Sequence, residues 1–287
     1  MKFGLRFFGL SPRHYTAVGR EAESCGFESV WMPEHLVFPA EMPATYPYSE
    51  SGYPPVVPDT PLYDPWVVLA SVAGATETIR LATNVFILPL RHPIATARSV
   101  VTLDRLSGGR VTLGAGVGWL EGEFEVVGQS FADRGRRMDE IMGILRALWT
   151  EDTVEHHGEF YDFGPVKFAP KAMQKPNIPI EIGGSSPAAL RRAGRLGDGW
   201  IEIGSLDTAD LGAKIETIRA HRREAGRSDL PFEITVGVAP EPAAVREAGD
   251  LGATRVVVGA APVNGRVSVG DVTDFVKRFA DEVIAKQ

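Results

Sequence analysis

Short runs of β-branched and aromatic residues alternate along the chain with longer segments of helical period, and this alternation limits the possible folds more than any other feature. It is typical of β–α–β units, in which each helix returns the chain to begin a new parallel strand. Eight candidate strands in 287 residues predict an α/β fold, a (β/α)8 TIM barrel that forms a single domain over residues 1–287. The strands are expected at residues 2–8, 29–32, 79–86, 110–115, 178–182, 199–203, 232–238 and 255–258.

Two helices carry clear signals of their own. Pro93 suits the first turn of a helix that runs to Leu106, and Ser107-Gly108-Gly109 would end it. Further along, apolar residues recur at steps of three and four, which predicts a helix whose apolar stripe packs on the barrel wall. The stripe consists of Met138, Ile141, Met142, Leu145, Leu148 and Trp149.

Charge and cysteine content exclude several classes of protein. Thirty Lys and Arg residues against 37 Asp and Glu residues give a formal charge of -7, which disfavours a nucleic-acid binder. The single cysteine, Cys25, excludes a disulfide within the chain and a cysteine-ligated zinc site. The first ten residues are interrupted by Arg6 and resemble neither a signal peptide nor a membrane anchor. We therefore expect a cytoplasmic protein that binds neither nucleic acid nor membranes.

Residues 36–64 are too long for an ordinary barrel connection and too rich in proline for a helix. A long loop after a barrel strand lies at the C-terminal end of the barrel, where such barrels keep their active sites. We expect this loop to cover a substrate, with Tyr63 among the substrate contacts; the alternative is a loosely held surface insertion. The loop contains Tyr46, Tyr48, Tyr53 and Tyr63.

Residues 151–177 form a second long segment, which predicts a small hairpin of unassigned role. Its His156 and His157 are adjacent, so on a strand their side chains point to opposite faces and do not readily bind one metal ion. We therefore expect no metal site in this protein.

The glycines of Gly114-Ala115-Gly116-Val117-Gly118-Trp119 follow the fourth strand. The sixth position is Trp119 instead of glycine, which argues against a dinucleotide-binding fingerprint. P-loop, nucleophile-elbow and zinc-helix motifs are absent from the sequence as well. Because glycine lacks Cβ, these glycines could let a flat ligand approach the backbone, or they could form a tight turn at the barrel rim.

Glu34 and His35 follow the second strand directly. The C-terminal end of a barrel strand is a position typical of catalytic residues. An imidazole beside a carboxylate can donate or accept a proton near neutral pH. We therefore predict His35 and Glu34 as catalytic residues, the alternative for the histidine being a structural role.

Residues 183–186, Gly-Gly-Ser-Ser, lead from the fifth strand into a helix that begins with Pro187. The exposed backbone N–H groups, the helix start and the hydroxyls of Ser185 and Ser186 together suit a phosphate. Capping of the helix by Ser185 or Ser186 uses the same residues and is the alternative.

Five stretches of the sequence resemble the bacterial luciferase-like monooxygenase superfamily, in particular its branch of oxidoreductases that use the deazaflavin coenzyme F420. The similarity covers the chain from the first strand to about Ile203 and continues more loosely to the C-terminus. The stretches are residues 26–35 (GFESVWMPEH), 81–93 (LATNVFILPLRHP), 103–110 (LDRLSGGR), 113–119 (LGAGVGW) and 183–186 (GGSS).

The resemblance implies a barrel that holds a flavin-like ring across the strand ends, with Glu34 and His35 near the ring and the phosphate on the loop after the fifth strand. It also implies a cis peptide bond between Asn84 and Val85, and a homodimer. Trp119 stands where related glucose-6-phosphate dehydrogenases have a glutamate, so that substrate is disfavoured and Trp119 becomes a substrate contact. The implied coenzyme contacts are Asn84, Val85, Gly114, Gly116, Gly118, Gly183, Gly184, Ser185 and Ser186.

The function that this resemblance implies is hydride transfer between coenzyme F420 and a small organic substrate. One alternative is an FMN-dependent monooxygenase that works with a separate flavin reductase, and another is a non-catalytic flavin-binding protein. Arg191 and Arg192 lie one turn beyond the expected phosphate loop. They would either meet the anionic lactyl-oligoglutamate tail of the deazaflavin or be solvated helix residues.

Overall fold

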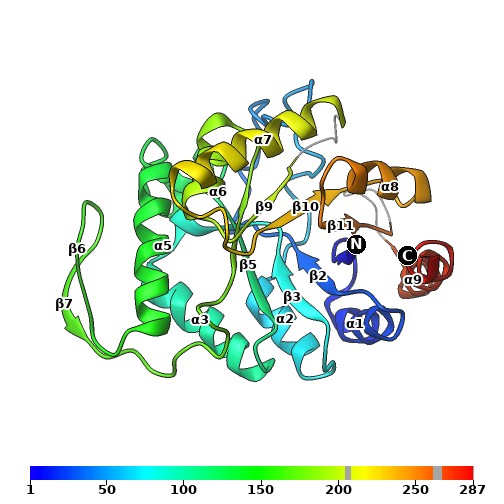
Figure 1. Ribbon diagram of the computed structural model, residues 1–287, viewed down its shortest axis with the longest axis horizontal. Helices are drawn as coiled ribbons and strands as arrows, with labels where there is room; N and C mark the ends of the chain where they lie inside the picture. Colours follow the sequence, from blue (N-terminus) through cyan, green and yellow to red (C-terminus); the bar gives the residue numbers. More distant parts are fainter. Residues whose placement is uncertain (204–207, 261–266, 287) are drawn as a thin grey trace.

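Eight parallel strands close into a barrel in the computed structural model, which describes residues 1–203, 208–260 and 267–286. The strands follow the order β3-β2-β1-β11-β10-β9-β8-β5, and β5 pairs with β3 to close the barrel (Figure 1). The predicted (β/α)8 TIM barrel is confirmed. The barrel strands are β1 (Lys2–Arg6), β2 (Ser29–Met32), β3 (Arg80–Thr83), β5 (Val111–Gly116), β8 (Ile180–Gly183), β9 (Gly199–Ile201), β10 (Glu233–Gly237) and β11 (Arg255–Val258).

Each predicted strand overlaps one barrel strand, but the third is interrupted. Strand β3 ends at Thr83, and the short β4 (Phe86–Ile87) resumes pairing with the end of β5. Between them, the peptide bond from Asn84 to Val85 is cis, as the family resemblance implied. The interruption places Asn84 and Val85 at the C-terminal end of the barrel.

Helices follow the strands and surround the barrel (Figure 1). The predicted limits of α3 are confirmed: it begins at Pro93 and ends at Leu106, and Gly108 and Gly109 follow with φ of 70° and 88°. The helices are α1 (Tyr15–Ser24), α2 (Pro65–Ala73), α3 (Pro93–Leu106), α4 (Glu121–Val126), α5 (Arg134–Thr150), α6 (Pro187–Leu196), α7 (Thr208–Glu224), α8 (Pro242–Asp250) and α9 (Val269–Glu282), with the 3-10 turns η1 (Pro12–His14), η2 (Leu88–Leu90) and η3 (Ile284–Lys286).

Helix α5 buries the predicted apolar stripe completely. All six side chains from Met138 to Trp149 lie in the main hydrophobic core. Full burial of one such side chain contributes about 1.5–3 kcal/mol, so the stripe is a major reason why α5 stays on the barrel wall.

The N-terminal end of the barrel is closed by a buried network of charged side chains. Arg255 of β11 donates to Glu181 of β8 at 2.8 Å and to Thr235 of β10 at 2.9 Å, and it also bonds Glu28. Burial raises the pKa of Glu181, while Arg255 opposes this shift. This network joins three strands at the N-terminal end of the barrel. A ligand site is therefore expected at the opposite, C-terminal end.

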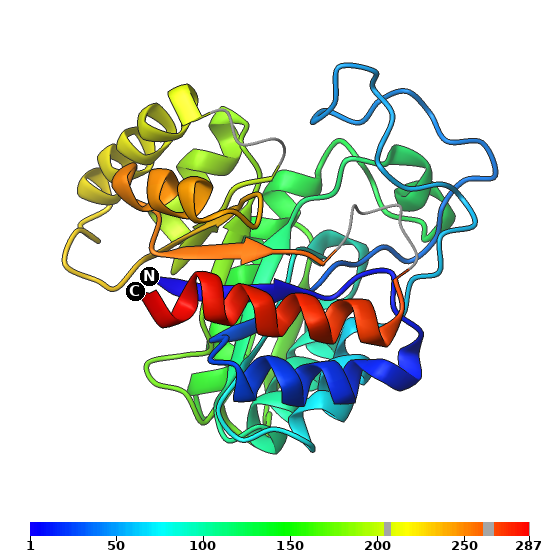
Figure 2. The ribbon, with the colours of Figure 1, turned by 90° about the vertical axis from the view of Figure 1, so that its right-hand side faces the viewer.

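Residues 33–64 contain no helix or strand and lie at the C-terminal end of the barrel. In Figure 2 they form the blue segment at the upper right, on the side toward which the arrows of β1 and β11 point. The loop ends where Asp64 caps α2 by accepting hydrogen bonds from the backbone N–H groups of Trp66 and Val67 at 2.9 and 3.1 Å. The N- and C-termini lie together at the other end (Figure 2).

Residues 151–177 include the predicted hairpin, formed by β6 (Val154–His157) and β7 (Asp162–Val166), which pair antiparallel. It projects outward beyond α5 (Figure 1). His156 contacts Glu140 of α5 at 3.0 Å, and His157 contacts Asp162 at 2.5 Å. None of the helices that the structure describes is both long and apolar enough to cross a membrane.

Candidate active site

The C-terminal strand ends gather most of the residues that the sequence singled out. His35 follows β2, the Asn84-Val85 peptide follows β3, Trp119 follows β5, and Gly184 follows β8. The loop of residues 36–64 adds aromatic side chains to the same region. This end of the barrel is therefore the candidate active site.

His35 is held by a carboxylate that the sequence analysis missed. Its Nδ1 lies 2.8 Å from Oε2 of Glu123, a residue of α4 with no exposed surface. The other carboxylate oxygen accepts from the backbone N–H of Leu36 at 2.5 Å. Because a carboxylate only accepts hydrogen bonds, the geometry assigns the proton of the neutral imidazole to Nδ1 and leaves Nε2 available for proton exchange.

Glu34 does not supply the carboxylate for His35, contrary to the sequence prediction. Its side chain is buried and accepts hydrogen bonds from the backbone N–H of Ile87 at 2.9 Å and from Arg91 at 2.7 Å. Burial raises the pKa of Glu34, whereas the guanidinium of Arg91 opposes that shift. Consecutive side chains after β2 diverge, so Glu34 fixes the segment after β3 while His35 faces the other way.

Aromatic rings form a continuous row from His35 toward the loop after β8. Ring centroids lie 4.8 Å apart for Phe38 and His35, 6.0 Å for His35 and Trp119, 5.1 Å for Trp119 and Tyr46, and 5.4 Å for Tyr46 and Tyr48. Most of these pairs are edge-on, a favourable arrangement for aromatic rings. Burial raises the pKa of Tyr46 to about 12, so its hydroxyl stays neutral. The row places Trp119 beside the imidazole of His35.

Tyr63, the other predicted substrate contact, has a different environment. Its ring lies 6.4 Å from that of Tyr15 on α1 and packs against the main hydrophobic core. Tyr53 is 53% exposed. Of the four tyrosines in this loop, Tyr46 and Tyr48 belong to the aromatic row. The spacing of prolines in the sequence does not indicate which of the four tyrosines take this position.

The side chain of Val85 occupies the space that two predicted ligand-binding glycines leave open. A Cβ at Gly116 or at Gly183 would lie 2.6 or 2.5 Å from a Val85 methyl group. At Gly114 it would collide with the carbonyl oxygen of Thr83. These glycines thus make room for the interrupted third strand at the barrel mouth, where the partly buried side chain of Val85 packs against them.

Gly118 has a different role from the other glycines after β5. Its φ is +82°, a conformation that side chains with a Cβ rarely adopt, and Ile87 and Phe124 pack close to its Cα. Gly118 therefore serves a backbone conformation at the barrel rim.

The side-chain oxygen of Asn84 is buried and has no hydrogen-bond partner among the residues that the structure describes. Leaving such an oxygen without a donor costs about 1–3 kcal/mol. Asn84 lies next to Val85, at the barrel mouth. The unpartnered oxygen is therefore suited to accept a hydrogen bond from a bound ring.

The loop after β8 caps α6 and is already engaged by neighbouring side chains. Ser186 accepts from the backbone N–H of Ala189 at 3.2 Å, which confirms Ser186 as the helix cap. Ser185 donates its hydroxyl hydrogen to Glu202 at 2.8 Å, and the hydroxyl oxygen of Tyr48 lies beside the same loop, 3.3 Å from where a Cβ on Gly184 would be. Burial and the nearby charge of Glu202 raise the pKa of Tyr48.

Glu202 was not foreseen in the sequence analysis; it follows β9 and is brought to Ser185 by the parallel pairing of β8 with β9. Its other oxygen accepts from Lys214 of α7 at 3.0 Å. At the start of α6, the hydroxyl of Ser185 is thus engaged by Glu202, and the hydroxyl of Tyr48 lies beside Gly184.

Comparisons with curated proteins give relatives with both types of flavin-like coenzyme. The Mycobacterium tuberculosis protein Rv0953c is 34% identical over 98% of this chain and 98% of its own length. The F420-dependent glucose-6-phosphate dehydrogenase of Amycolatopsis mediterranei is 30% identical over 66% of this chain and 53% of that protein. The FMNH(2)-dependent dimethylsulfone monooxygenase of Pseudomonas putida is 31% identical over 55% of this chain and 44% of that protein.

Solved structures share the fold at low sequence identity. Monooxygenase RslO1 from Streptomyces bottropensis has a TM-score of 0.80 and 21% identity, with 100% of this chain and 99% of that chain covered. The coenzyme F420 dependent tetrahydromethanopterin reductase from Methanopyrus kandleri has a TM-score of 0.78 and 19% identity, with 99% of both chains covered. The sequence pattern of one family of oxidoreductases and monooxygenases matches residues 9–255. This chain therefore belongs to the luciferase-like monooxygenase family, which includes F420-dependent and FMN-dependent members.

Proposed function

We propose that this protein is an oxidoreductase that transfers a hydride between the deazaflavin coenzyme F420 and a small organic substrate. The observation that carries the proposal is the His35–Glu123 contact, which leaves Nε2 of an ordered imidazole available beside Trp119 at the strand ends. Hydride transfer to or from a carbonyl or alcohol group must be matched by proton transfer, and an imidazole is suited to that task at neutral pH.

The residues at the barrel mouth fit a tricyclic ring with a phosphate. Val85 offers an apolar floor, Asn84 an unpartnered acceptor for a ring N–H, and the start of α6 a place for the phosphate. When bound there, the deazaflavin supplies the hydride chemistry. The hydroxyl of Tyr48 lies beside Gly184, where the phosphate would bind, so we expect Tyr48 to leave this position when the coenzyme binds.

The protein's own residues then orient the substrate and move the proton. Nε2 of His35 gives or takes the proton, and the negative charge of Glu123 stabilises the imidazolium that forms in one direction of the reaction. Trp119 and Tyr46 line the substrate side and exclude water. An aromatic wall favours an uncharged organic substrate over a charged one.

An FMN-dependent monooxygenase that works with a separate flavin reductase is the second candidate. It is favoured by the similarity to the dimethylsulfone monooxygenase. The same barrel mouth would serve it, because the two coenzymes share a tricyclic ring and a phosphate. A fold of this kind does not by itself fix the chemistry.

A turnover assay with a panel of alcohols, aldehydes and ketones tests the proposal. We expect substrate-dependent oxidation or reduction of the deazaflavin by the wild-type protein. His35→Ala should lower turnover by about 10²-fold or more while the coenzyme still binds. Turnover only with FMN, a reductase and oxygen would overturn the deazaflavin proposal. Tight coenzyme binding without turnover of any substrate would instead favour a non-catalytic flavin-binding protein.

A further inference from the structure

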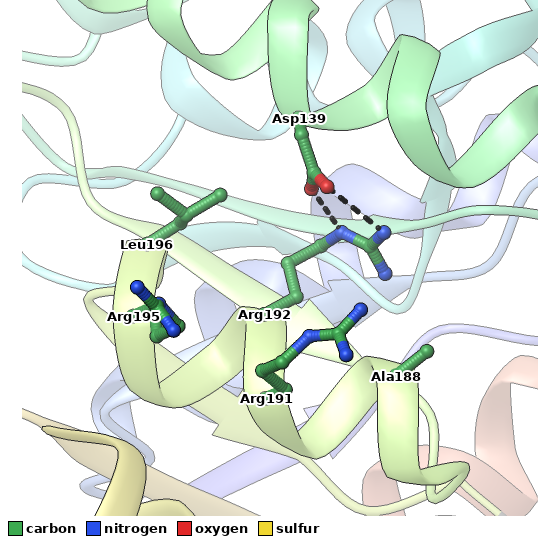
Figure 3. A pocket seen from close by; sticks show the side chains of 6 residues that line it. All are labelled: Asp139, Ala188, Arg191, Arg192, Arg195 and Leu196. Carbon is green, nitrogen blue, oxygen red and sulfur yellow. Dashed lines mark hydrogen bonds and ion pairs between the residues drawn. The ribbon is translucent and has the colours of Figure 1, made fainter. Parts of the chain in front are cut away.

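A pocket of about 180 Å³ lies between α5 and α6, close to the first turn of α6. Figure 3 shows its side chains, with Arg192 reaching from α6 to Asp139 on α5 and Arg191 beside it. Three guanidinium groups and one carboxylate line the pocket, which gives it a formal charge of +2 in a chain whose formal charge is -7. Its lining residues are Asp139, Ala188, Arg191, Arg192, Arg195 and Leu196.

Arg192 has a structural role in this pocket. Only 8% exposed, it forms an ion pair with Asp139 and donates to the backbone carbonyl of Gly135 at 3.0 Å. It therefore ties α6 to α5. The sequence suggested Arg191 and Arg192 as contacts for an anionic tail, but Arg192 is already paired with Asp139.

Arg191 and Arg195 are both exposed, and neither forms an ion pair with any residue that the structure describes. They are four residues apart, so their side chains project from the same face of α6. Ala188, in the first turn, continues this face toward the helix start. The guanidinium groups of Arg191 and Arg195, which have no ion-pair partner among the described residues, thus lie one after the other along the pocket.

The distance along α6 from Ser186 to Arg191 and Arg195 sets how long a ligand bound at the helix start must be to reach both side chains. At a rise of about 1.5 Å per residue, Arg191 lies roughly 7 Å and Arg195 roughly 13 Å along the axis from Ser186. A phosphate held at the helix start would therefore have both guanidinium groups within reach of a chain attached to it. Arginine forms paired hydrogen bonds with carboxylates, so a chain of carboxylates is the matching ligand.

We propose that Arg191 and Arg195 form a subsite for the carboxylates of the coenzyme's tail, beyond the phosphate at the start of α6. This inference rests on the proposed function, because it takes the deazaflavin as the bound coenzyme. As a consequence, the pocket would bind a coenzyme with a polycarboxylate tail more tightly than one that ends at its phosphate, as FMN does.

Fluorescence titrations with three coenzyme forms test the subsite. The probes are deazaflavin with several glutamates, deazaflavin shortened to its lactyl phosphate, and FMN. At low salt, the wild-type protein should bind the glutamate-bearing form about fivefold to tenfold more tightly than the shortened form, as expected for two exposed ion pairs. This preference should decline at higher salt.

The double variant Arg191→Ala/Arg195→Ala should bind both deazaflavin forms equally and keep the wild-type affinity for the shortened form. The matched control is Arg223→Ala/Arg246→Ala, which removes two exposed positive charges elsewhere and should keep the preference. All the substituted arginines are exposed, so the thermal midpoint verifies that each variant remains folded.

Equal binding of both deazaflavin forms to the wild-type protein would overturn the subsite while leaving the proposed function intact. A preference that survives in the Arg191→Ala/Arg195→Ala variant would overturn it too. Binding of FMN alone would overturn the proposed function, and the subsite with it.

Discussion

Nδ1 of His35 and Oε2 of Glu123 lie 2.8 Å apart, although the two residues are 88 positions apart in the sequence. The contact joins the segment after β2 to α4, and both belong to the C-terminal end of the barrel. Glu123 also accepts from the backbone N–H of Leu36, so one buried carboxylate fixes both the ring of His35 and the first residue of the long loop. The orientation of the imidazole and the path of the loop therefore depend on the same group.

Glu123→Gln should lower turnover by about tenfold or more and leave coenzyme affinity close to that of the wild type. The amide oxygen can still accept from Leu36, but the amide N–H group cannot accept the proton of Nδ1, so the tautomer of His35 changes. Steady-state kinetics and coenzyme titration separate the two effects. Glu125→Gln, an exposed position on the same helix, is the control. Wild-type turnover in Glu123→Gln would show that the tautomer does not matter.

Asn84→Ala should weaken coenzyme binding by about threefold to tenfold, the value of one hydrogen bond. The side-chain oxygen has no described partner within the protein, so its removal should cost little thermal stability. Equilibrium titration and a thermal unfolding curve measure the two quantities. A large loss of stability with unchanged coenzyme affinity would mean that Asn84 supports the fold instead of the ligand.

Tyr48→Phe should increase the affinity for the coenzyme by about threefold to tenfold, because it removes the hydroxyl that lies beside Gly184 at the expected phosphate position. Stopped-flow mixing would show whether the gain lies in the association rate. Tyr53→Phe alters an exposed tyrosine of the same loop and should have no effect. Weaker binding in Tyr48→Phe would indicate that the hydroxyl contacts the bound coenzyme.

Glu23→Gln should destabilise the fold at neutral pH by about 1 kcal/mol. Oε1 of Glu23 accepts from the backbone N–H groups of Glu77, Thr78 and Ile79 at 2.9, 2.6 and 2.9 Å. Partial burial favours the neutral carboxyl, but these hydrogen bonds outweigh it and lower the pKa of Glu23.

Because the pKa is lowered in the folded state, the contribution of Glu23 is complete above the ordinary glutamate value of 4.5 and is lost as the pH falls through the folded-state value. Urea unfolding of the wild type and Glu23→Gln should therefore differ at neutral pH and converge in acid. A difference that stays constant across this range would contradict the assignment. Glu247→Gln, at an exposed position, is the control.

Most of the fold could be predicted from the sequence because each element carries a local signal. The helix from Pro93 to Leu106 has proline at its start and glycines after its end, and the stripe on α5 repeats at helical spacing. The interruption of the third strand could not be read from residue type, since Asn84 and Val85 lie inside an otherwise continuous strand pattern. Only the family resemblance pointed to it.

The candidate site could be predicted in part. His35 was identifiable because it follows a strand, and strand ends converge in a barrel. Trp119 was identified through the family resemblance. Glu123 lies in a helix of six residues, too short to show a period, and Glu202 and Tyr48 reach the loop after β8 from other parts of the chain. These contacts depend on tertiary packing. The adjacency of Glu34 and His35 suggested a pair, but their side chains take different partners.

Equilibrium titration of the purified wild-type protein with coenzyme F420 and with FMN, under identical conditions, distinguishes the two coenzymes. We expect saturable binding of the deazaflavin at lower concentrations than FMN. FMN binding at least as tight as that of the deazaflavin, together with substrate-dependent oxygen consumption in the presence of a flavin reductase, would contradict it.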